Sequence, residues 1–201
     1  PELWWQAVRN VLSGLIPELG RNPIAGLAVD GTSSTLLAAT REGVPLGPAL
    51  MYDDNRAQGF VARIKAQAPP GTIVASAGSS LAKSLYLASR LQQDDIGHLL
   101  HQADWILGKL SGRFGVSDEN NALKLGYDPV ARRWPDWVFR LGLSAAWLPN
   151  VYRPGTEIAP LSSSTARQLG LSPRIPVFAG TTDSTAATRA ASTLGLKGLV
   201  M

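Results

Sequence analysis

The stretch that decides the fold runs from Ala179 to Ala187 and reads AGTTDSTAA. It continues a short apolar run, Ile175 to Ala179, whose proline lies near the start, where a missing N–H is best tolerated in a strand. We therefore predict a buried strand here, followed by a helix from about Ser184 to Leu194. The small residues between them let a ligand approach the backbone, and the free N–H groups of a helix N-terminus attract phosphate.

Asp183 lies at this strand-to-helix turn and has two interpretations. As a helix N-cap, its carboxylate would accept hydrogen bonds from the first N–H groups of the helix. As a catalytic carboxylate in phosphoryl transfer, it would orient a hydroxyl and take its proton late, since most of the rate there comes from alignment and charge neutralisation. The local sequence leaves both interpretations open.

A second strand end carries a loop rich in hydroxyl groups. Ile24 to Val29 is an apolar run bounded by Pro23 and by Asp30-Gly31, which predicts another buried strand. The loop after it, Asp30 to Thr35, reads DGTSST. Such a loop can hold a polyhydroxy ligand, because each hydroxyl both donates and accepts hydrogen bonds, or its side chains can satisfy neighbouring backbone groups.

The next segment predicts a hairpin followed by a charged turn. Thr35 to Ala39 and Val44 to Met51 are apolar stretches joined by Arg41-Glu42-Gly43, which is a turn signal. Directly after them comes Tyr52-Asp53-Asp54-Asn55-Arg56. The two carboxylates beside an arginine would bind a polar substrate, or one of them would cap the next helix.

Helical periodicity dominates the rest of the chain. The expected helices are an opening amphipathic helix from Leu3 that ends near Pro17 and Gly20, then Asn55 to Ala66, Ser80 to Leu91, and about Asp94 to Leu110. The last of these contains His98 and His101, which we interpret as packing or surface residues because their spacing does not match a metal-binding pair. Residues 112–150 show no assignable period. Helices interspersed with a hairpin and short buried strands imply an α/β or mixed α+β domain.

Composition restricts the class of protein. With 201 residues, 45% of them hydrophobic and 17% charged, the chain reads as an ordinary soluble globular protein. It has no apolar run of transmembrane length and no signal-peptide pattern at its start, so we expect no membrane partner. The absence of cysteine excludes a thiolate metal site and a cysteine nucleophile. The net charge of +4 comes from scattered basic residues, which favours solvated surface charge over nucleic-acid binding.

In their order and spacing, these segments resemble the FGGY carbohydrate kinases over essentially the whole chain. That family has a strand with a small-residue sugar loop, a hairpin leading into an aromatic-x-Asp-x-Arg motif, and a helix ending in Lys-Leu-x-Gly. It also has an Asn/Ser-rich stretch ending in Tyr-Asp, and a Gly-x-x-Asp turn before a helix. The matching segments here are Ile24 to Thr35, Gly43 to Leu46 with Tyr52 to Arg56, Asp104 to Gly112, Glu119 to Asp128 with Trp134, and Gly180 to Ala187.

The resemblance implies an actin-like, RNase H-type α/β fold, with a mixed sheet and flanking helices. Such a domain binds a sugar, and ATP with Mg²⁺, in a cleft against a second domain of the same type. The resemblance makes Asp183 the base that takes the proton from the sugar hydroxyl attacking the γ-phosphate. Ser184 is expected to touch the sugar, and Thr181 and Thr182 are expected to contact ATP. We assign no residue of the chain as a metal ligand.

The resemblance also suggests which sugar is bound. Ser33 and Ser34 fall where xylulokinases carry Met-His sugar contacts, and Lys124 falls where ribulokinases have a sugar-contacting lysine. Small hydroxyls in place of Met-His shift the match towards ribulokinases. We therefore expect a ketopentose substrate, D-ribulose first and D-xylulose second, with glycerol as a further alternative. Besides Ser184, the expected substrate-binding residues are Ser33, Ser34, Asp30, Tyr52 (in place of the family's usual tryptophan), Asp54 and Lys124.

By the same resemblance, residues 1–201 are the N-terminal, sugar-binding domain of a longer chain, incomplete at both ends. The family's first strands, with an Asp-x-Gly-Thr hairpin that contacts the ATP phosphates and Mg²⁺, should precede Pro1. The domain that holds the adenosine should follow Met201, and Leu199 to Met201 looks like the start of a strand. We expect the chain to be inactive without this remainder, and we place the enzyme in the cytoplasm or in a plastid.

Two other classes of function stay open at this stage. A metal-dependent RNase H-type nuclease shares the fold type, and Asp30 and Asp183 would contribute to its metal site, although that chemistry needs several converging carboxylates. A non-catalytic relative would bind a sugar or nucleotide as a sensor or scaffold, since a fold does not guarantee an activity. The presence of Asp183 argues against a pure binder, which has no need of a base.

Overall fold

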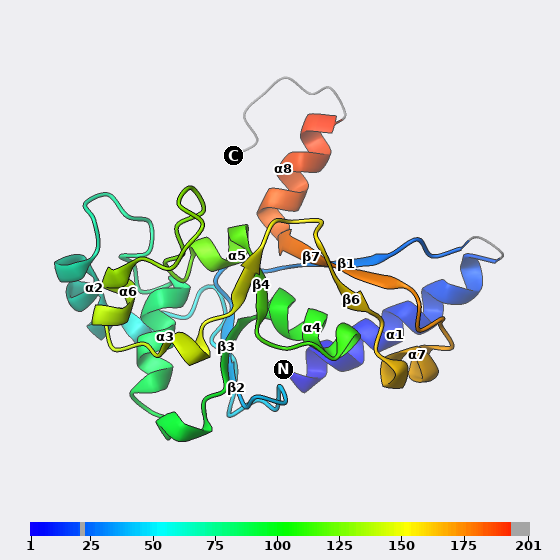
Figure 1. The fold of residues 1–201 in the computed structure, drawn as a ribbon, viewed down its shortest axis with the longest axis horizontal. Coiled ribbons are helices and arrows are strands. Elements are labelled where there is room, and N and C mark those ends of the chain that lie inside the picture. The colour runs from blue at the N-terminus through cyan, green and yellow to red at the C-terminus, as the bar shows by residue number, and fades with distance from the viewer. Residues whose placement is uncertain (21–22, 194–201) are drawn as a thin grey trace.

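The computed structural model describes residues 1–20 and 23–193 (Figure 1). Its helices are α1 (Glu2–Glu18), α2 (Val61–Gln67), α3 (Ser80–Ala88), α4 (Gln102–Ser111), α5 (Glu119–Leu123), α6 (Asp136–Arg140), α7 (Ser163–Leu169) and α8 (Asp183–Thr193). Its strands are β1 (Leu27–Gly31), β2 (Leu36–Ala39), β3 (His98–His101), β4 (Val116–Asp118), β5 (Asn150–Tyr152), β6 (Glu157–Pro160) and β7 (Pro176–Thr182). Short 3₁₀ turns lie at Arg56–Phe60, Gln93–Asp95 and Ala145–Trp147.

The strands pair into one central sheet and two smaller pairs. In the sheet of β1, β7 and β6, the middle strand β7 runs parallel to β1 and antiparallel to β6. Strands β2 and β3 pair in antiparallel orientation, and β4 and β5 pair in parallel orientation. Helix α4 packs on β1 and β7, and α1 packs on α4 and α7 (Figure 1). This arrangement confirms the predicted mixed sheet with flanking helices.

Strand β2 separates two hydrophobic cores. Leu36 and Ala38 point into a core shared with α2 and α3, whereas Leu37 and Ala39 point into a core shared with α1, α4 and β7. All four side chains are buried, because successive side chains alternate between the faces of a strand and this strand is covered on both. A strand covered on both faces is an apolar run without alternation, which is the pattern of these four residues.

The predicted helix from Asp94 to Leu110 is wrong in its first half. His98–His101 form strand β3 beside β2, and α4 begins only after them. Leu99 faces one core and Leu100 the other, so the apolar spacing of a two-sided strand runs without a break into that of the helix. The boundary signal is Asp104, whose carboxylate accepts from the backbone N–H of His101 in a capping box at the start of α4.

The predicted hairpin is present only as a loose return of the chain. Residues 44–51 run back along β2 and bond it at Leu36, whose N–H and C=O pair with Leu50 at 2.9 and 2.8 Å. Pro45 and Pro48 lack an N–H and cannot extend this ladder. The regular partner of β2 is therefore β3 rather than the predicted second arm.

The other predicted elements agree with the structure to within a few residues. The opening helix is α1, the two short apolar runs are β1 and β7, and the last helix is α8. The prediction that the first run is buried is wrong, because the residues of β1 alternate between half-buried and exposed. The unassigned residues 112–150 hold β4, α5 and α6, and Trp147 there is buried as part of a core. The strand expected at Leu199–Met201 lies outside the described residues. None of the helices in the described part of the chain is long and apolar enough to span a membrane.

Candidate active site

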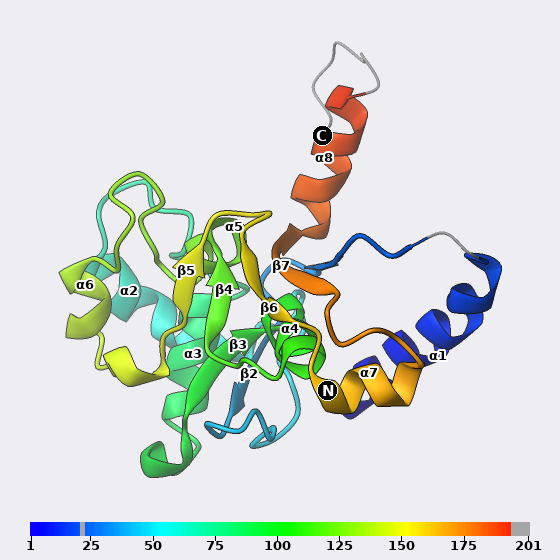
Figure 2. The ribbon, with the colours of Figure 1, turned by 45° about the vertical axis from the view of Figure 1, so that its right-hand side comes forward.

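Two of the predicted segments meet at one edge of the central sheet. In the pairing of β1 with β7, Asp30 lies opposite Thr181 and Gly31 lies opposite Thr182. Because these strands are parallel, the loop after β1 and the helix after β7 leave the sheet at the same edge. Residues 32–35, called the hydroxyl loop below, and the first turn of α8 are thereby brought together. From this edge α8 projects away from the body of the molecule (Figure 2).

A bulge in β7 sets where this strand ends. Around Gly180, three successive residue steps of β7, from Phe178 to Thr181, face two of β1. A Cβ on Gly180 would lie 1.7 Å from the carbonyl oxygen of Val29, which is far inside van der Waals contact. Glycine is therefore required for the two strands to close at the bulge, independently of any ligand.

The N-cap of α8 is Thr182 and not Asp183. The buried Thr182 hydroxyl accepts from the Thr185 N–H at 3.4 Å and lies 2.8 Å from the Thr185 hydroxyl. Asp183 is the first residue of α8, is exposed, and accepts from the Ser184 N–H at 2.7 Å. Because its neighbour fills the capping role, the Asp183 carboxylate stays open to a ligand at a helix N-terminus.

The neighbours of Asp183 differ in what their side chains do. The Thr181 hydroxyl accepts from the Asn120 side-chain amide at 2.8 Å. The Thr182 hydroxyl is turned inward as the cap, so this geometry lends no support to its predicted contact with ATP. Ser184 is exposed, with its hydroxyl 3.4 Å from that of Thr182. Ser184 is thus the hydroxyl beside Asp183 that remains accessible.

The hydroxyl loop is tied to α4 at its first residue. The side-chain oxygen of Gln102 accepts from both the N–H and the hydroxyl of Thr32, at 3.1 and 2.9 Å. Ser34 has a positive φ of 65°, which residues other than glycine rarely adopt. Ser33 and Ser34 are half-buried and Asp30 is exposed, so none of the three residues is fully buried.

The charged turn of residues 52–56 closes on itself. Nε of Arg56 donates to both carboxylate oxygens of Asp54, at 2.9 and 3.1 Å, and the Arg56 guanidinium lies 6.0 Å from the ring centre of Tyr86. Hydrogen bonding from Arg56, opposed by partial burial, holds the pKa of Asp54 below its ordinary value. Asp54 therefore locks the turn, whereas the Tyr52 side chain next to it is exposed.

Strand β4 is connected to this edge by Asp118, which no motif singles out, and by Asn120 in the Asn/Ser-rich stretch. Asp118, 2% exposed, accepts from the N–H groups of Asn120 and Asn121 and from the Asn121 side-chain amide. Burial, and then the nearby Asp104 carboxylate, raise the pKa of Asp118 against these hydrogen bonds. Asn120 in turn donates to Thr181, so Asp118 caps α5 and helps to fix the end of β7. The sequence signal was an aspartate immediately before a helix start.

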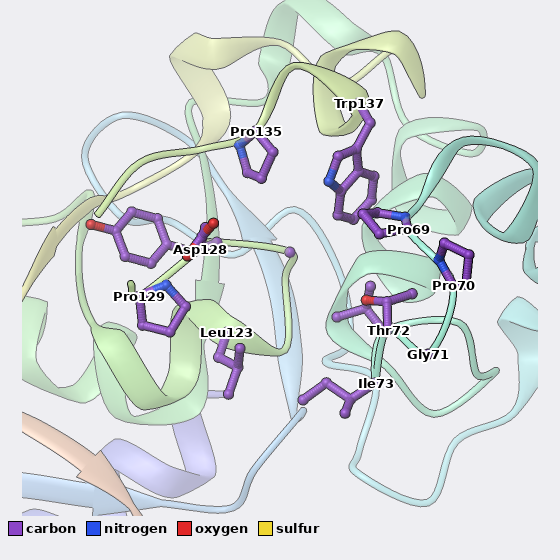
Figure 3. A pocket seen from close by; sticks show the side chains of 13 residues that line it. Pro69, Pro70, Gly71, Thr72, Ile73, Leu123, Asp128, Pro129, Pro135 and Trp137 are labelled. Atoms are coloured by element: carbon purple, nitrogen blue, oxygen red, sulfur yellow. The ribbon is translucent and has the colours of Figure 1, made fainter. Parts of the chain in front are cut away.

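Lys124 directly follows α5 and lies near a cavity that is separate from the sheet edge. Its carbonyl accepts from the Leu81 N–H at 3.1 Å, which joins α5 to α3, and the residue is half-buried. The cavity, of about 290 Å³, lies between residues 69–74 and residues 123–137 (Figure 3). Prolines and Trp137 dominate its walls, and none of the predicted site residues lines it. The carboxylate among its lining residues, Asp128, accepts from the N–H groups of Val130 and Ala131.

A buried hydrogen-bonded chain links β3, α3 and α4. The His101 ring lies 2.8 Å from the Ser80 hydroxyl through Nε2 and 3.0 Å from the Asp104 carboxylate through Nδ1. This is the connectivity of a Ser-His-Asp hydrolase triad. However, Ser80 and His101 are 0% exposed, so no substrate reaches them and the chain is a structural tie. The prediction of His101 as a packing residue is correct, although it lies in a strand and not in a helix.

In the described part of the chain, no three His, Asp or Glu side chains gather where they could hold a metal ion. The constellation that an RNase H-type nuclease requires is therefore missing from residues 1–20 and 23–193.

Similarity to known proteins defines the class. The model of the family described as "FGGY family of carbohydrate kinases, N-terminal domain" matches residues 1–189. Over 192 residues, 90% of the chain, the sequence is 23% identical to a xylulose kinase of Staphylococcus xylosus, of which it covers 39%. A xylulose kinase structure from Rhodospirillum rubrum matches with a TM-score of 0.85 and 23% identity, over 95% of this chain and 41% of that one. A gluconate kinase structure from Lactobacillus acidophilus matches with a TM-score of 0.79 and 18% identity, over 92% and 39%.

The fold and the sequence match together define a sugar-kinase domain. The chain belongs to the FGGY family of carbohydrate kinases, through its N-terminal domain. This confirms the resemblance drawn from the ordered motifs. The chain spans about two fifths of the length of the relatives it matches.

Proposed function

We propose that the protein, in its natural full length, transfers the γ-phosphate of ATP to a hydroxyl group of a sugar, with Asp183 as the base. The observation that carries this proposal is the position of Asp183. It is an exposed carboxylate on the first turn of α8, at the sheet edge where the hydroxyl loop begins. Membership of the carbohydrate kinase family supports the type of reaction.

The proposed reaction depends on alignment more than on covalent help from the protein. The sugar presents one hydroxyl to the Asp183 carboxylate, which orients it and accepts its proton as the oxygen bonds to the γ-phosphorus. The bond from that phosphorus to the β,γ-bridging oxygen breaks, and ADP leaves. The N–H groups at the start of α8 favour the negative charge of the phosphate. The nucleotide substrate is MgATP, whose Mg²⁺ would neutralise part of the phosphate charge during transfer.

The proposed sugar is a ketopentose, with D-ribulose ahead of D-xylulose and glycerol. Two half-buried serines, Ser33 and Ser34, support a ligand with many hydroxyl groups, because each serine hydroxyl both donates and accepts. Asp30, Tyr52, Lys124 and Ser184 are proposed as further sugar contacts. Relatives named for xylulose and for gluconate have the same fold, so the fold itself does not choose among sugars.

The complete enzyme, as we propose it, uses more chain than residues 1–201. The relatives matched here are about two and a half times longer, and the adenosine of ATP is proposed to bind outside this chain. Because the Thr182 hydroxyl caps α8, we propose Thr181 and the N–H groups of the first turn of α8 as the ATP contacts within this chain. The cytoplasm, or a plastid, is the proposed compartment.

The test is a screen of ATP consumption by the natural full-length protein. D-ribulose, D-xylulose, D-gluconate and glycerol are offered in turn with MgATP, and ADP and the phosphorylated sugar are measured. Turnover with one ketopentose at least tenfold above the others would agree with the proposal. Turnover with none of them, together with sugar binding by calorimetry, would instead indicate a non-catalytic sugar-binding relative.

A further inference from the structure

Helix α3 carries a lysine whose whole side chain is buried. Lys83 is 0% exposed and extends from α3. Its side chain reaches the hydroxyl loop, which precedes β2, and the start of the charged turn, which follows the return of residues 44–51. An ammonium group inside a protein is costly unless its donors are satisfied. The polar residues Ser80, Lys83 and Ser84 have the spacing that places them on one face of α3, and all three are buried. Buried polar side chains such as these need hydrogen-bond partners inside the protein.

The partners of Lys83 are backbone carbonyl groups of both loops. Its Nζ donates to the carbonyl of Ser34 at 2.8 Å, of Met51 at 2.7 Å and of Tyr52 at 3.3 Å. An ammonium has three N–H donors, and the three carbonyls match them in number. Ser34 belongs to the hydroxyl loop, Met51 is the last residue of the return along β2, and Tyr52 is the first residue of the charged turn. The Lys83 side chain therefore connects the hydroxyl loop with the charged turn, which are separated in the sequence by β2 and by the residues that run back along it.

The hydroxyl loop has a backbone conformation that the hydrogen bond from Lys83 stabilises. Ser34 has φ 65°, a left-handed conformation that persists in a serine only when its surroundings hold it. The first residue of the loop, Thr32, is held by Gln102. Towards the other end of the loop, the carbonyl group of Ser34 is held by Lys83. Without the second anchor, the loop is free to relax to an ordinary backbone conformation.

The electrostatic surroundings agree with a role in holding backbone and not in pairing with a carboxylate. Burial lowers the pKa of Lys83 to about 8, and the charges of Asp54 and Asp53 offset only part of this shift. Asp54 is already paired with Arg56. The Lys83 hydrogen bonds that the structure contains go to carbonyl groups alone in the described residues.

We propose that Lys83 is a positioning residue of the sugar site, which holds the hydroxyl loop and the charged turn in the relative geometry that a sugar requires. This inference rests on the proposed function, because it assumes that these two segments face the sugar. Lys83 touches neither the sugar nor ATP. Pre-ordered loops lower the ordering cost that binding must otherwise meet, so Lys83 acts on sugar affinity first.

The test replaces Lys83 in the natural full-length protein. Lys83→Met removes the three donors while keeping an unbranched side chain of similar length. The sugar KM, measured with the best acceptor of the screen, is expected to rise about tenfold or more, with the ATP KM within about twofold of wild type. Lys83→Gln retains two N–H donors and is expected to give an intermediate sugar KM. Direct calorimetry should show the same order of sugar affinities.

A matched control separates positioning from simple loss of stability. Leu87→Ala lies on the same helix, in the adjoining core, and contacts neither loop through a hydrogen bond. It should lower the melting temperature while leaving the sugar KM unchanged. A sugar KM for Lys83→Met and Lys83→Gln no higher than that of Leu87→Ala would overturn the inference. If Lys83→Met does not fold, the comparison of Lys83→Gln with Leu87→Ala decides it. Absence of sugar turnover in the wild-type protein would overturn the proposed function instead.

Discussion

At the scale of single residues, the main result is a division of roles between Thr182 and Asp183. The sequence allows Asp183 to be either a cap or a base, because both need a carboxylate at a helix start. In the structure Thr182 supplies the capping oxygen, and the exposed Asp183 carboxylate is left at the N-terminus of α8. Thr182 takes the Thr185 N–H, while the exposed Asp183 carboxylate accepts from the Ser184 N–H alone within the described residues, which agrees with the role proposed for it as the base.

The buried Lys83 gives a prediction about stability and pH. Its pKa is about 8 in the folded protein and 10.5 when unperturbed, so between these values the unfolded chain holds a proton that the folded chain has lost. Stability rises with pH wherever the unfolded state binds more protons. The urea midpoint of wild type, measured relative to that of Lys83→Met, should therefore increase from pH 8 to pH 10. If the difference in urea midpoint between wild type and Lys83→Met stays constant or falls from pH 8 to pH 10, the lowered pKa of Lys83 in the folded protein is contradicted.

Lys83 and Asp118 also mark what the sequence does not reveal. The sequence predicts a helix from Ser80 to Leu91 without marking Lys83 in it, and only the fold brings three carbonyls to its ammonium group. Asp118 reads as an ordinary helix cap, and its burial depends on β7 lying against β4. In contrast, Asp183 and the serines of the hydroxyl loop follow predicted strands directly, which is why the motifs locate them.

At the scale of elements, the strands that carry the candidate site were predictable and β3 was not. Strands β1 and β7 are short apolar runs bounded by proline, glycine or aspartate, so their limits are visible in the sequence. Strand β3 has no such boundary before α4, and both of its faces are buried. The hairpin arm was overpredicted because the prolines at 45 and 48 limit its hydrogen bonding.

The close approach of β1 and β7 makes Gly180 a sensitive position. Gly180→Ala places a Cβ against the Val29 carbonyl oxygen, so the strands must separate at the bulge. We expect destabilisation of about 2 kcal/mol or more, measured by denaturant unfolding. Gly47→Ala is the control, because a Cβ there meets nothing within 4 Å, and it should be nearly neutral. Equal effects of the two substitutions would show that the bulge does not require glycine.

At the scale of the whole molecule, the chain belongs to a family whose matched members are much longer. Residues 1–201 are therefore expected to phosphorylate no sugar when purified alone, even with MgATP in excess. Coupled detection of ADP over several hours is the measurement, and the natural full-length protein is its positive control. Sugar-dependent ADP formation by the purified chain, beyond the ATPase background, would show that the remainder is dispensable.

The most direct test of the account is the sugar-dependent rate of ADP formation by the natural full-length protein and its Asp183→Asn variant. Loss of the base is expected to lower kcat about a thousandfold, with the sugar KM little changed, because general-base catalysis contributes on that order. Asp136→Asn, an exposed acid at the start of α6, should behave as wild type. A correctly folded Asp183→Asn enzyme that turns over sugar at the wild-type rate would contradict the central claim.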